Sequence, residues 1–105
     1  MSHIWVILNF LFTVSNPRTL VHLMGMVRAS TDKGHEVTVF FNEDAVKLLV
    51  QYPVLSELDV EMLACQTTCR MANIEEEDLI RGARMTSMAE IVMMMENKDR
   101  TLFIG

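Results

Sequence analysis

The sequence has little cysteine, glycine and positive charge, and each shortage excludes a class of protein. Its 105 residues contain two cysteines, four glycines, and nine Lys or Arg against fourteen Asp or Glu, for a formal net charge of -5. A surface for nucleic acids needs clustered basic side chains opposite the phosphates, so nucleic acid is not an expected partner. Two cysteines are too few for a secreted domain held by several disulfides. They favour the cytoplasm, where thiols stay reduced.

No apolar run is long enough to cross a membrane. The first run, Ile4 to Phe12, is interrupted by Asn9 and falls far short of the ~20 residues that a spanning helix needs. It has no Lys or Arg before it and no small-residue cleavage site after it, as a signal peptide would. We therefore expect a buried strand here and no membrane association.

Loops and clusters that hold cofactors or metals are also missing. Residues 13–19 follow the first expected strand, where many α/β folds bind phosphate, but they contain no glycine. A phosphate-binding loop needs glycines so that the backbone can approach closely, so no nucleotide or flavin is expected. The three histidines are scattered, and Cys65 and Cys69 have no second ligand pair, so no metal is expected either.

The chain does contain a regular alternation of strand and helix patterns. Strands are expected at residues 4–12, 35–41, 58–64, 83–85 and 100–104, and helices at 17–33, 43–49, directly after 65, 74–80 and 87–97. Helix starts are expected at Asn42 and at two capping boxes, 73–76 and 87–90. This alternation predicts one α/β domain over residues 1–105, with a mostly parallel five-stranded sheet and helices on both faces.

Three segments follow strands at the edge of the sheet where parallel α/β proteins bind ligands: 13–18, 42–44 and 65–70. Only the third contains thiols. Cys65 lies between a strand and a helix, and the positive end of the helix dipole favours the nucleophilic thiolate. The alternative is that Cys65 is a small buried side chain, as most free cysteines are.

Cys69 and Arg70 follow one helical turn later. If the helix begins at Cys65, the two sulfur atoms share a face, but helical geometry resists a disulfide between them. Packing or a supporting role is therefore favoured for Cys69, and a role in resolving an oxidised Cys65 stays open. The guanidinium of Arg70 is suited to bind an anionic sulfur donor.

The last expected helix is apolar on nearly all sides. Met88, Ile91, Val92 and Met95 share one face, while Met93 and Met94 lie on others. In a chain of this length, the additional burial is expected to come from another subunit.

Several segments resemble the DsrE/DsrF-like sulfur-relay family. They are residues 63–71 (LACQTTCRM), 77–83 (EDLIRGA), 34–41 (GHEVTVFF) and the helix and strand of 89–104. The resemblance implies a three-layer flavodoxin-like fold, assembly into homo- or hetero-oligomers such as trimers or hexamers, and sulfur carried as a cysteine persulfide. By this resemblance Cys65 corresponds to the acceptor cysteine. Cys69 is an additional thiol, and the segment 51–58 is short.

Together these observations predict a small cytoplasmic sulfur carrier or sulfurtransferase without a cofactor. Cys65 would hold the sulfur, Cys69 would assist, and Arg70 would bind the donor; the partners would be sulfur donor and acceptor proteins. Two alternatives remain open: a non-enzymatic assembly or regulatory module, and a redox protein that cycles a Cys65–Cys69 disulfide.

Overall fold

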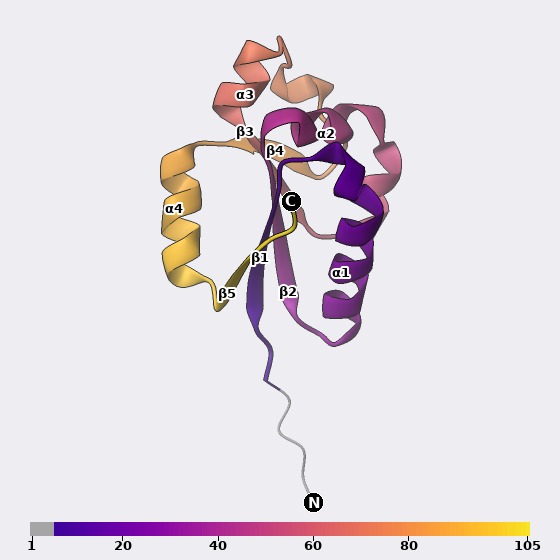
Figure 1. Ribbon diagram of the computed structural model, residues 1–105, viewed down its shortest axis with the longest axis vertical. Helices are drawn as coiled ribbons and strands as arrows, with labels where there is room; N and C mark the ends of the chain where they lie inside the picture. The colour runs from indigo at the N-terminus through magenta and orange to yellow at the C-terminus, as the bar shows by residue number, and fades with distance from the viewer. Residues whose placement is uncertain (1–5) are drawn as a thin grey trace, which may run out of the picture.

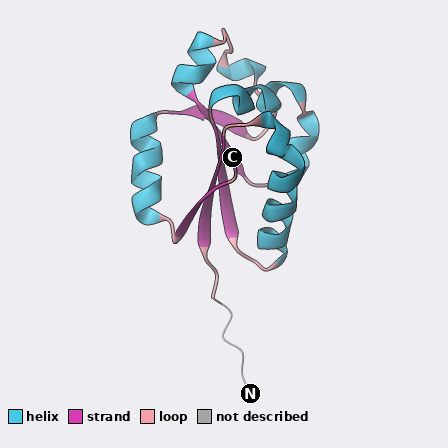
Figure 2. Cartoon of the chain, in the orientation of Figure 1, coloured by secondary structure: helices cyan, strands magenta, loops and turns pink. Residues whose placement is uncertain are grey.

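The computed structural model describes residues 6–105, which form a five-stranded parallel sheet with helices on both faces (Figures 1 and 2). The strands are β1 (Asn9–Val14), β2 (Glu36–Phe41), β3 (Glu61–Cys65), β4 (Ala83–Thr86) and β5 (Arg100–Phe103), in the order β4-β3-β2-β1-β5. The α-helices are α1 (Leu20–Asp32), α2 (Leu48–Gln51), α3 (Gln66–Met71) and α4 (Met88–Asn97). Short 3-10 helices occupy Pro17–Thr19, Glu43–Lys47, Pro53–Leu58 and Glu76–Asp78. The predicted fold class is confirmed.

The sheet separates two apolar cores. α1 and α2 lie on one side, α4 lies alone on the other, and α3 stands above the carboxyl end of β3 (Figure 1). Because side chains alternate along a strand, each central strand supplies both cores. The smaller core, beneath α4, contains Leu11, Phe40, Leu63, Cys65 and Ile91.

A single helix cannot cover the whole face beneath α4. Five strands span about 19 Å at ~4.8 Å per interval, whereas a helix with its side chains is roughly 10 Å wide. The centre of the face is sealed by Ile91, which is fully buried, but Phe103 on the edge strand β5 remains 75 % exposed.

The first strand was expected too early in the chain. β1 begins at Asn9 rather than at residue 4, and it continues through Thr13 and Val14, which were expected to end it. Its neighbours explain the shift: β2 pairs with it from Glu36 opposite Asn9, and neither neighbour extends further back. Val6 and Ile7 are exposed before the strand, and residues 4 and 5 of the expected strand lie outside the described residues.

Three other local expectations are also corrected. β3 begins at Glu61 and not at residue 58, because the 3-10 helix Pro53–Leu58 takes up the preceding residues. The capping box is formed by Glu75 and Asp78 rather than by residues 73–76, since Asn73 has a left-handed φ of 56°. Asn42 precedes a helical turn as expected, but its side chain caps nothing.

The end of α1 and the start of α4 agree better with the boundaries expected from the sequence. α1 ends before Gly34, whose φ of 87° permits the left-handed turn into β2. Ser87 caps α4, its hydroxyl oxygen accepting a hydrogen bond from the Glu90 amide at 3.2 Å. Within residues 6–105, none of the helices has both the length and the apolar character that crossing a bilayer requires.

Candidate functional site

Cys65 is the last residue of β3 and lies at the carboxyl edge of the sheet. It adopts an extended backbone (φ -61°, ψ 115°) as the residue that caps α3, which begins at Gln66. Its side chain belongs to the core beneath α4, and the residue is 6 % exposed. Cys65 therefore lies at the end of a strand, as predicted, but it is buried.

Two helices begin close to Cys65. α3 starts at the next residue, and Thr86, the register partner of Cys65 on β4, comes two residues before the start of α4. Ile91 from the first turns of α4 lies in the same apolar cluster as Cys65. The starts of two helices therefore lie close to Cys65 in the fold.

The carboxylate of Glu90, near the start of α4, is paired with Arg84. Arg84 on β4 donates to Glu90 Oε1 at 2.9 Å and lies 3.5 Å from Glu61 Oε2. The hydrogen bond from Arg84 lowers the pKa of Glu90, and the Arg84 pKa is raised mainly by the same bond. Glu90 is therefore charged and paired with Arg84. Because of this pairing, Glu90 repels another negative charge near the start of α4 less strongly.

Cys69 lies in the other core. It is fully buried among the side chains beneath α1 and α2, whereas Cys65 packs beneath α4. Burial raises the pKa of the Cys69 thiol, and a negative charge on Cys65 raises it further. Both cysteines are free. The helix begins at Gln66 and not at Cys65, so the condition under which both sulfurs would share one helical face is not met.

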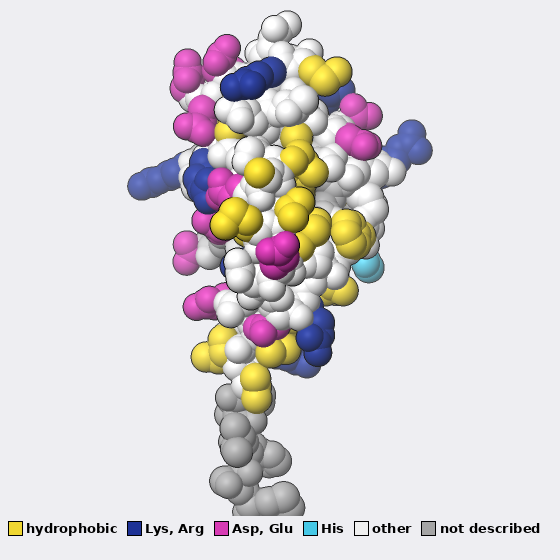
Figure 3. Space-filling model, turned by 90° about the vertical axis from the view of Figure 1, so that its left-hand side faces the viewer, with side chains coloured by type: hydrophobic (Ala, Val, Ile, Leu, Met, Phe, Trp, Pro, Cys, Tyr) yellow, Lys and Arg dark blue, Asp and Glu magenta, His cyan; other side chains and the backbone are white. Residues whose placement is uncertain are grey.

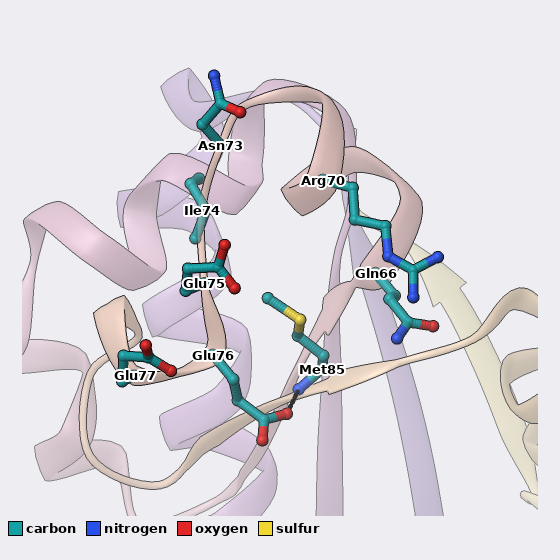
Figure 4. Close-up of a pocket in the computed structure, with 8 residues that line it drawn as sticks. All are labelled: Gln66, Arg70, Asn73, Ile74, Glu75, Glu76, Glu77 and Met85. Carbon is teal, nitrogen blue, oxygen red and sulfur yellow. Dashed lines mark hydrogen bonds between the residues drawn. The ribbon is translucent and has the colours of Figure 1, made fainter.

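A polar cavity of about 450 Å³ adjoins α3 (Figure 4). Gln66 and Arg70, the residues that directly follow the two cysteines, form one side. The chain from Asn73 to Glu77 forms the opposite side, and Met85 lies between them. The Met85 amide donates to Glu76 Oε2 at 2.9 Å, which ties this segment to β4.

The charge of this cavity is predominantly negative. Glu75, Glu76 and Glu77 line it together with one cation, Arg70. The sequence suggested Arg70 as a donor-binding residue but did not indicate that three acidic residues would line the same cavity. The run of acidic residues at 75–77 was the signal in the sequence that could have indicated this. The run reaches the cavity because the chain turns at Asn73, which has a left-handed φ.

A model of the DsrE/DsrF-like family matches residues 9–104, which include both cysteines and Arg70. The chain belongs to the DsrE/DsrF-like family. No curated protein matches the sequence.

Three solved structures share the fold of this DsrE/DsrF-like chain. A protein of unknown function from Methanobacterium thermoautotrophicum, MTH1491, is 20 % identical, with a TM-score of 0.83 over 91 % of this chain and 98 % of its own. The ychN protein of E. coli is 16 % identical, with a TM-score of 0.78 over 93 % and 99 %. BT1422 from Bacteroides thetaiotaomicron, also of unknown function, is 14 % identical, with a TM-score of 0.72 over 90 % and 93 %. At these identities the likeness concerns the fold.

The structure places the three residues of the site expected for this DsrE/DsrF-like chain in three different surroundings. Arg70 lies in the cavity beside α3, while the thiols of Cys65 and Cys69 pack into separate cores and do not line it. Among residues 6–105, no group of three or more His, Cys, Asp or Glu side chains is arranged to hold a metal ion.

Proposed function

We propose that this DsrE/DsrF-like chain is a sulfur carrier that holds sulfane sulfur as a persulfide on Cys65 and transfers it to a partner protein. The observation that supports the proposal is the position of Cys65 at the carboxyl end of a central parallel strand, beside the starts of α3 and α4. Ligands and reactive groups of parallel α/β sheets gather at this edge.

The loading step conserves atoms and electrons. The Cys65 thiolate attacks the outer sulfur of a donor persulfide, R–S–SH, and a new S–S bond forms on Cys65. The S–S bond of the donor breaks, and the donor leaves as the thiolate R–S⁻, while the proton stays with the transferred sulfur. There is no net oxidation, because this is a thiol–disulfide type of exchange.

The burial of Cys65 suits a carrier more than an open catalyst. Only 6 % of the residue's surface is exposed, which shields a bound persulfide from other thiols. The second sulfur atom extends the side chain by about 2 Å, one S–S bond length. Because the side chain belongs to the core beneath α4, the outer sulfur must meet the acceptor thiol through the small exposed part of Cys65.

Arg70 is proposed to contact the donor, with Gln66 beside it. Because three carboxylates share the cavity with Arg70, an inorganic dianion is repelled there. A donor that carries both a carboxylate and an ammonium group, such as the persulfide of an amino-acid or peptide thiol, matches both signs of charge. Cys69 is proposed to support α3 by packing, since its buried thiol has a raised pKa.

The face that carries α4 is proposed to associate with other subunits. Apolar side chains gather across this face in Figure 3, and Met88, Val92, Met93 and Phe103 are all at least 49 % exposed. Homo-oligomers, as trimers or hexamers, would bury them. A persulfide carrier of this kind would work in the cytoplasm, with sulfur donor and acceptor proteins as its other partners.

Mass spectrometry of the intact protein tests the proposed carrier. After incubation with an amino-acid or peptide persulfide and removal of the excess, the wild type should gain the mass of one sulfur atom, and reduction should remove it. Cys69→Ser is the matched control and should load normally, whereas Cys65→Ser should not load. Equal loading of the two single variants, or loading that requires Cys69, contradicts the proposal.

An assembly or regulatory module is the second candidate, and the same burial of Cys65 favours it. In that case the α4 face would still form oligomers, but native Cys65 would accept no sulfur. Light scattering after size-exclusion chromatography, together with the loading experiment, separates the two candidates. A multimer that never loads is the signature of the second.

A further inference from the structure

Thr86, the last residue of β4, is the register partner of Cys65, the last residue of β3. Register partners on neighbouring parallel strands lie about 4.8 Å apart, and their side chains point to the same face of the sheet. For Cys65 this is the face beneath α4, because the residue belongs to the core that contains Ile91. The hydroxyl of Thr86 therefore lies on the same face as the thiol, one strand away from it.

The neighbours of Thr86 agree with this orientation. The pKa of Glu90 on α4 is lowered by the hydrogen bond from Arg84 and, to a smaller extent, by one from the Thr86 hydroxyl. Arg84 lies two residues before Thr86 on β4, so the alternation of side chains along a strand directs both toward α4. Thr86 is buried there, which makes its hydroxyl a polar group inside an otherwise apolar layer.

The Thr86 hydroxyl lacks a strong acceptor of its own. It donates to Ser87 O at 3.5 Å, which is the outer limit of a hydrogen bond. The carboxylate of Glu90 is already paired, since Arg84 donates to its Oε1 at 2.9 Å. A buried donor with a poor acceptor is unfavourable, so the hydroxyl gains by turning to a better acceptor that appears beside it.

A persulfide on Cys65 would supply that acceptor. After loading, the proton of the outer sulfur passes to water through the small exposed part of Cys65, and the sulfur becomes an anion. A negative charge in an apolar core is costly unless it receives a hydrogen bond.

Thr86 is well placed among the buried polar side chains to donate that hydrogen bond. Of the described residues, the buried polar ones are Thr13, Thr38 and Thr86. Thr38 donates to Glu61 at the amino end of β3, and Thr13 lies on β1, two strands from β3. Thr86 alone among these three is the register partner of Cys65.

We propose that the Thr86 hydroxyl donates a hydrogen bond to the outer sulfur of the Cys65 persulfide and so holds the transferred sulfur at the carboxyl edge of the sheet. This inference rests on the proposed carrier function and adds the residue that binds its cargo. One S–S bond extends the Cys65 side chain by about 2 Å, which brings the outer sulfur within reach of the neighbouring strand. Because a hydrogen bond to a charged acceptor is stronger than one to a neutral acceptor, the bond favours the loaded state.

Intact-mass measurement of loading at equilibrium tests the role of the hydroxyl, with glutathione persulfide and glutathione as the probe pair. Every protein carries Cys69→Ser, so that Cys65 is the only thiol, and this single variant is the parent. Thr86→Val removes the hydroxyl but keeps the branched side chain, and it should lower the loading constant about tenfold, a loss typical of a hydrogen bond to a charged group. Thr86→Ser keeps the hydroxyl and should load like the parent.

Two controls separate the hydroxyl from the packing of α4. Thr13→Val removes another buried hydroxyl from the same face of the sheet and should load like the parent. Iodoacetamide should alkylate unloaded Cys65 at the same rate in Thr86→Val and in the parent, because the hydroxyl donates to Ser87 O before loading. Faster alkylation in Thr86→Val would assign the loading defect to a loosened α4 and overturn the proposal.

The outcomes distinguish this inference from the carrier function itself. If Thr86→Val loads as well as a parent that does load, the role of Thr86 is wrong and the carrier function stands. Equal defects in Thr86→Ser and Thr86→Val, or a defect in Thr13→Val, also overturn the role of Thr86, because they indicate packing rather than a hydrogen bond. If the parent takes up no sulfur, both proposals fail.

Discussion

The two cysteines should differ in native reactivity by about two orders of magnitude. Cys69 is fully buried, so iodoacetamide reaches it only when the structure opens. Opening at the low end of domain stability, about 5 kcal/mol, slows the reaction roughly 4000-fold relative to a free thiol. The raised pKa of Cys69 acts in the same direction, since less thiolate is present at neutral pH.

Cys65 is 6 % exposed, whereas Cys69 has no exposed surface. If its rate scales with its exposed fraction of 6 %, alkylation is only about 17-fold slower than for a free thiol. The ratio of the two native rates is therefore about 200 in favour of Cys65.

Single-cysteine variants allow each rate to be measured separately. Cys69→Ser reports on Cys65, and Cys65→Ser reports on Cys69, with intact mass followed over time at neutral pH. In denaturant the two rates should converge, which is the control for intrinsic differences. Similar rates in the folded state, or a faster Cys69, would refute the assignment of the two thiols to a reachable and a sealed position.

Further predictions concern folding and pH. Ile91→Ala should lower the free energy of unfolding by about 2–5 kcal/mol, while Val92→Ala beside it, half exposed, should change it by less than about 0.5 kcal/mol; urea titration checks both. Gly82→Ala should cost about 1–2 kcal/mol because φ is 89°, whereas Gly25→Ala within α1 meets no atom within 4 Å and should stabilise by up to ~1 kcal/mol. The folded-state pKa of Glu90 is lowered, so the stability advantage of the wild type over Glu90→Gln should be present above the unfolded pKa of this carboxyl. That advantage should disappear as the pH falls through the lower folded pKa, which thermal melts across acid pH measure.

The sequence predicted the architecture well because hydrophobic periodicity and turn residues act locally. The five strands, their parallel arrangement and the helix after Cys65 follow from that pattern. The start of β1 could not be predicted, since residues 4–8 are as apolar as the strand itself. Where pairing begins depends on β2 and β5, which are distant in sequence.

The candidate site was predicted less completely, because side-chain placement depends on which core a residue enters. The sequence placed Cys65 and Cys69 one helical turn apart, but the extended backbone of Cys65 directs the two residues to opposite cores. The segments 13–18 and 42–44 were recognised as following strands. The lack of glycine in residues 13–19 excluded a phosphate site, and nothing in residues 42–44 indicated that Asn42 Oδ1 would be buried without a partner.

One structural cause connects the buried thiol with the exposed apolar face: α4 covers its face of the sheet alone. At the centre, Ile91 of α4 and Cys65 lie in the same apolar core, whereas Phe103 on the edge strand β5 remains exposed. On the β4 side, Arg84 forms ion pairs with Glu61 and Glu90, so charged side chains lie there instead of apolar ones. Ile91→Ala should therefore speed the alkylation of Cys65, whereas Phe103→Ala should leave its rate unchanged because Phe103 lies outside this core. An equal effect of the two variants in the alkylation assay would contradict the idea that α4 controls access to the thiol.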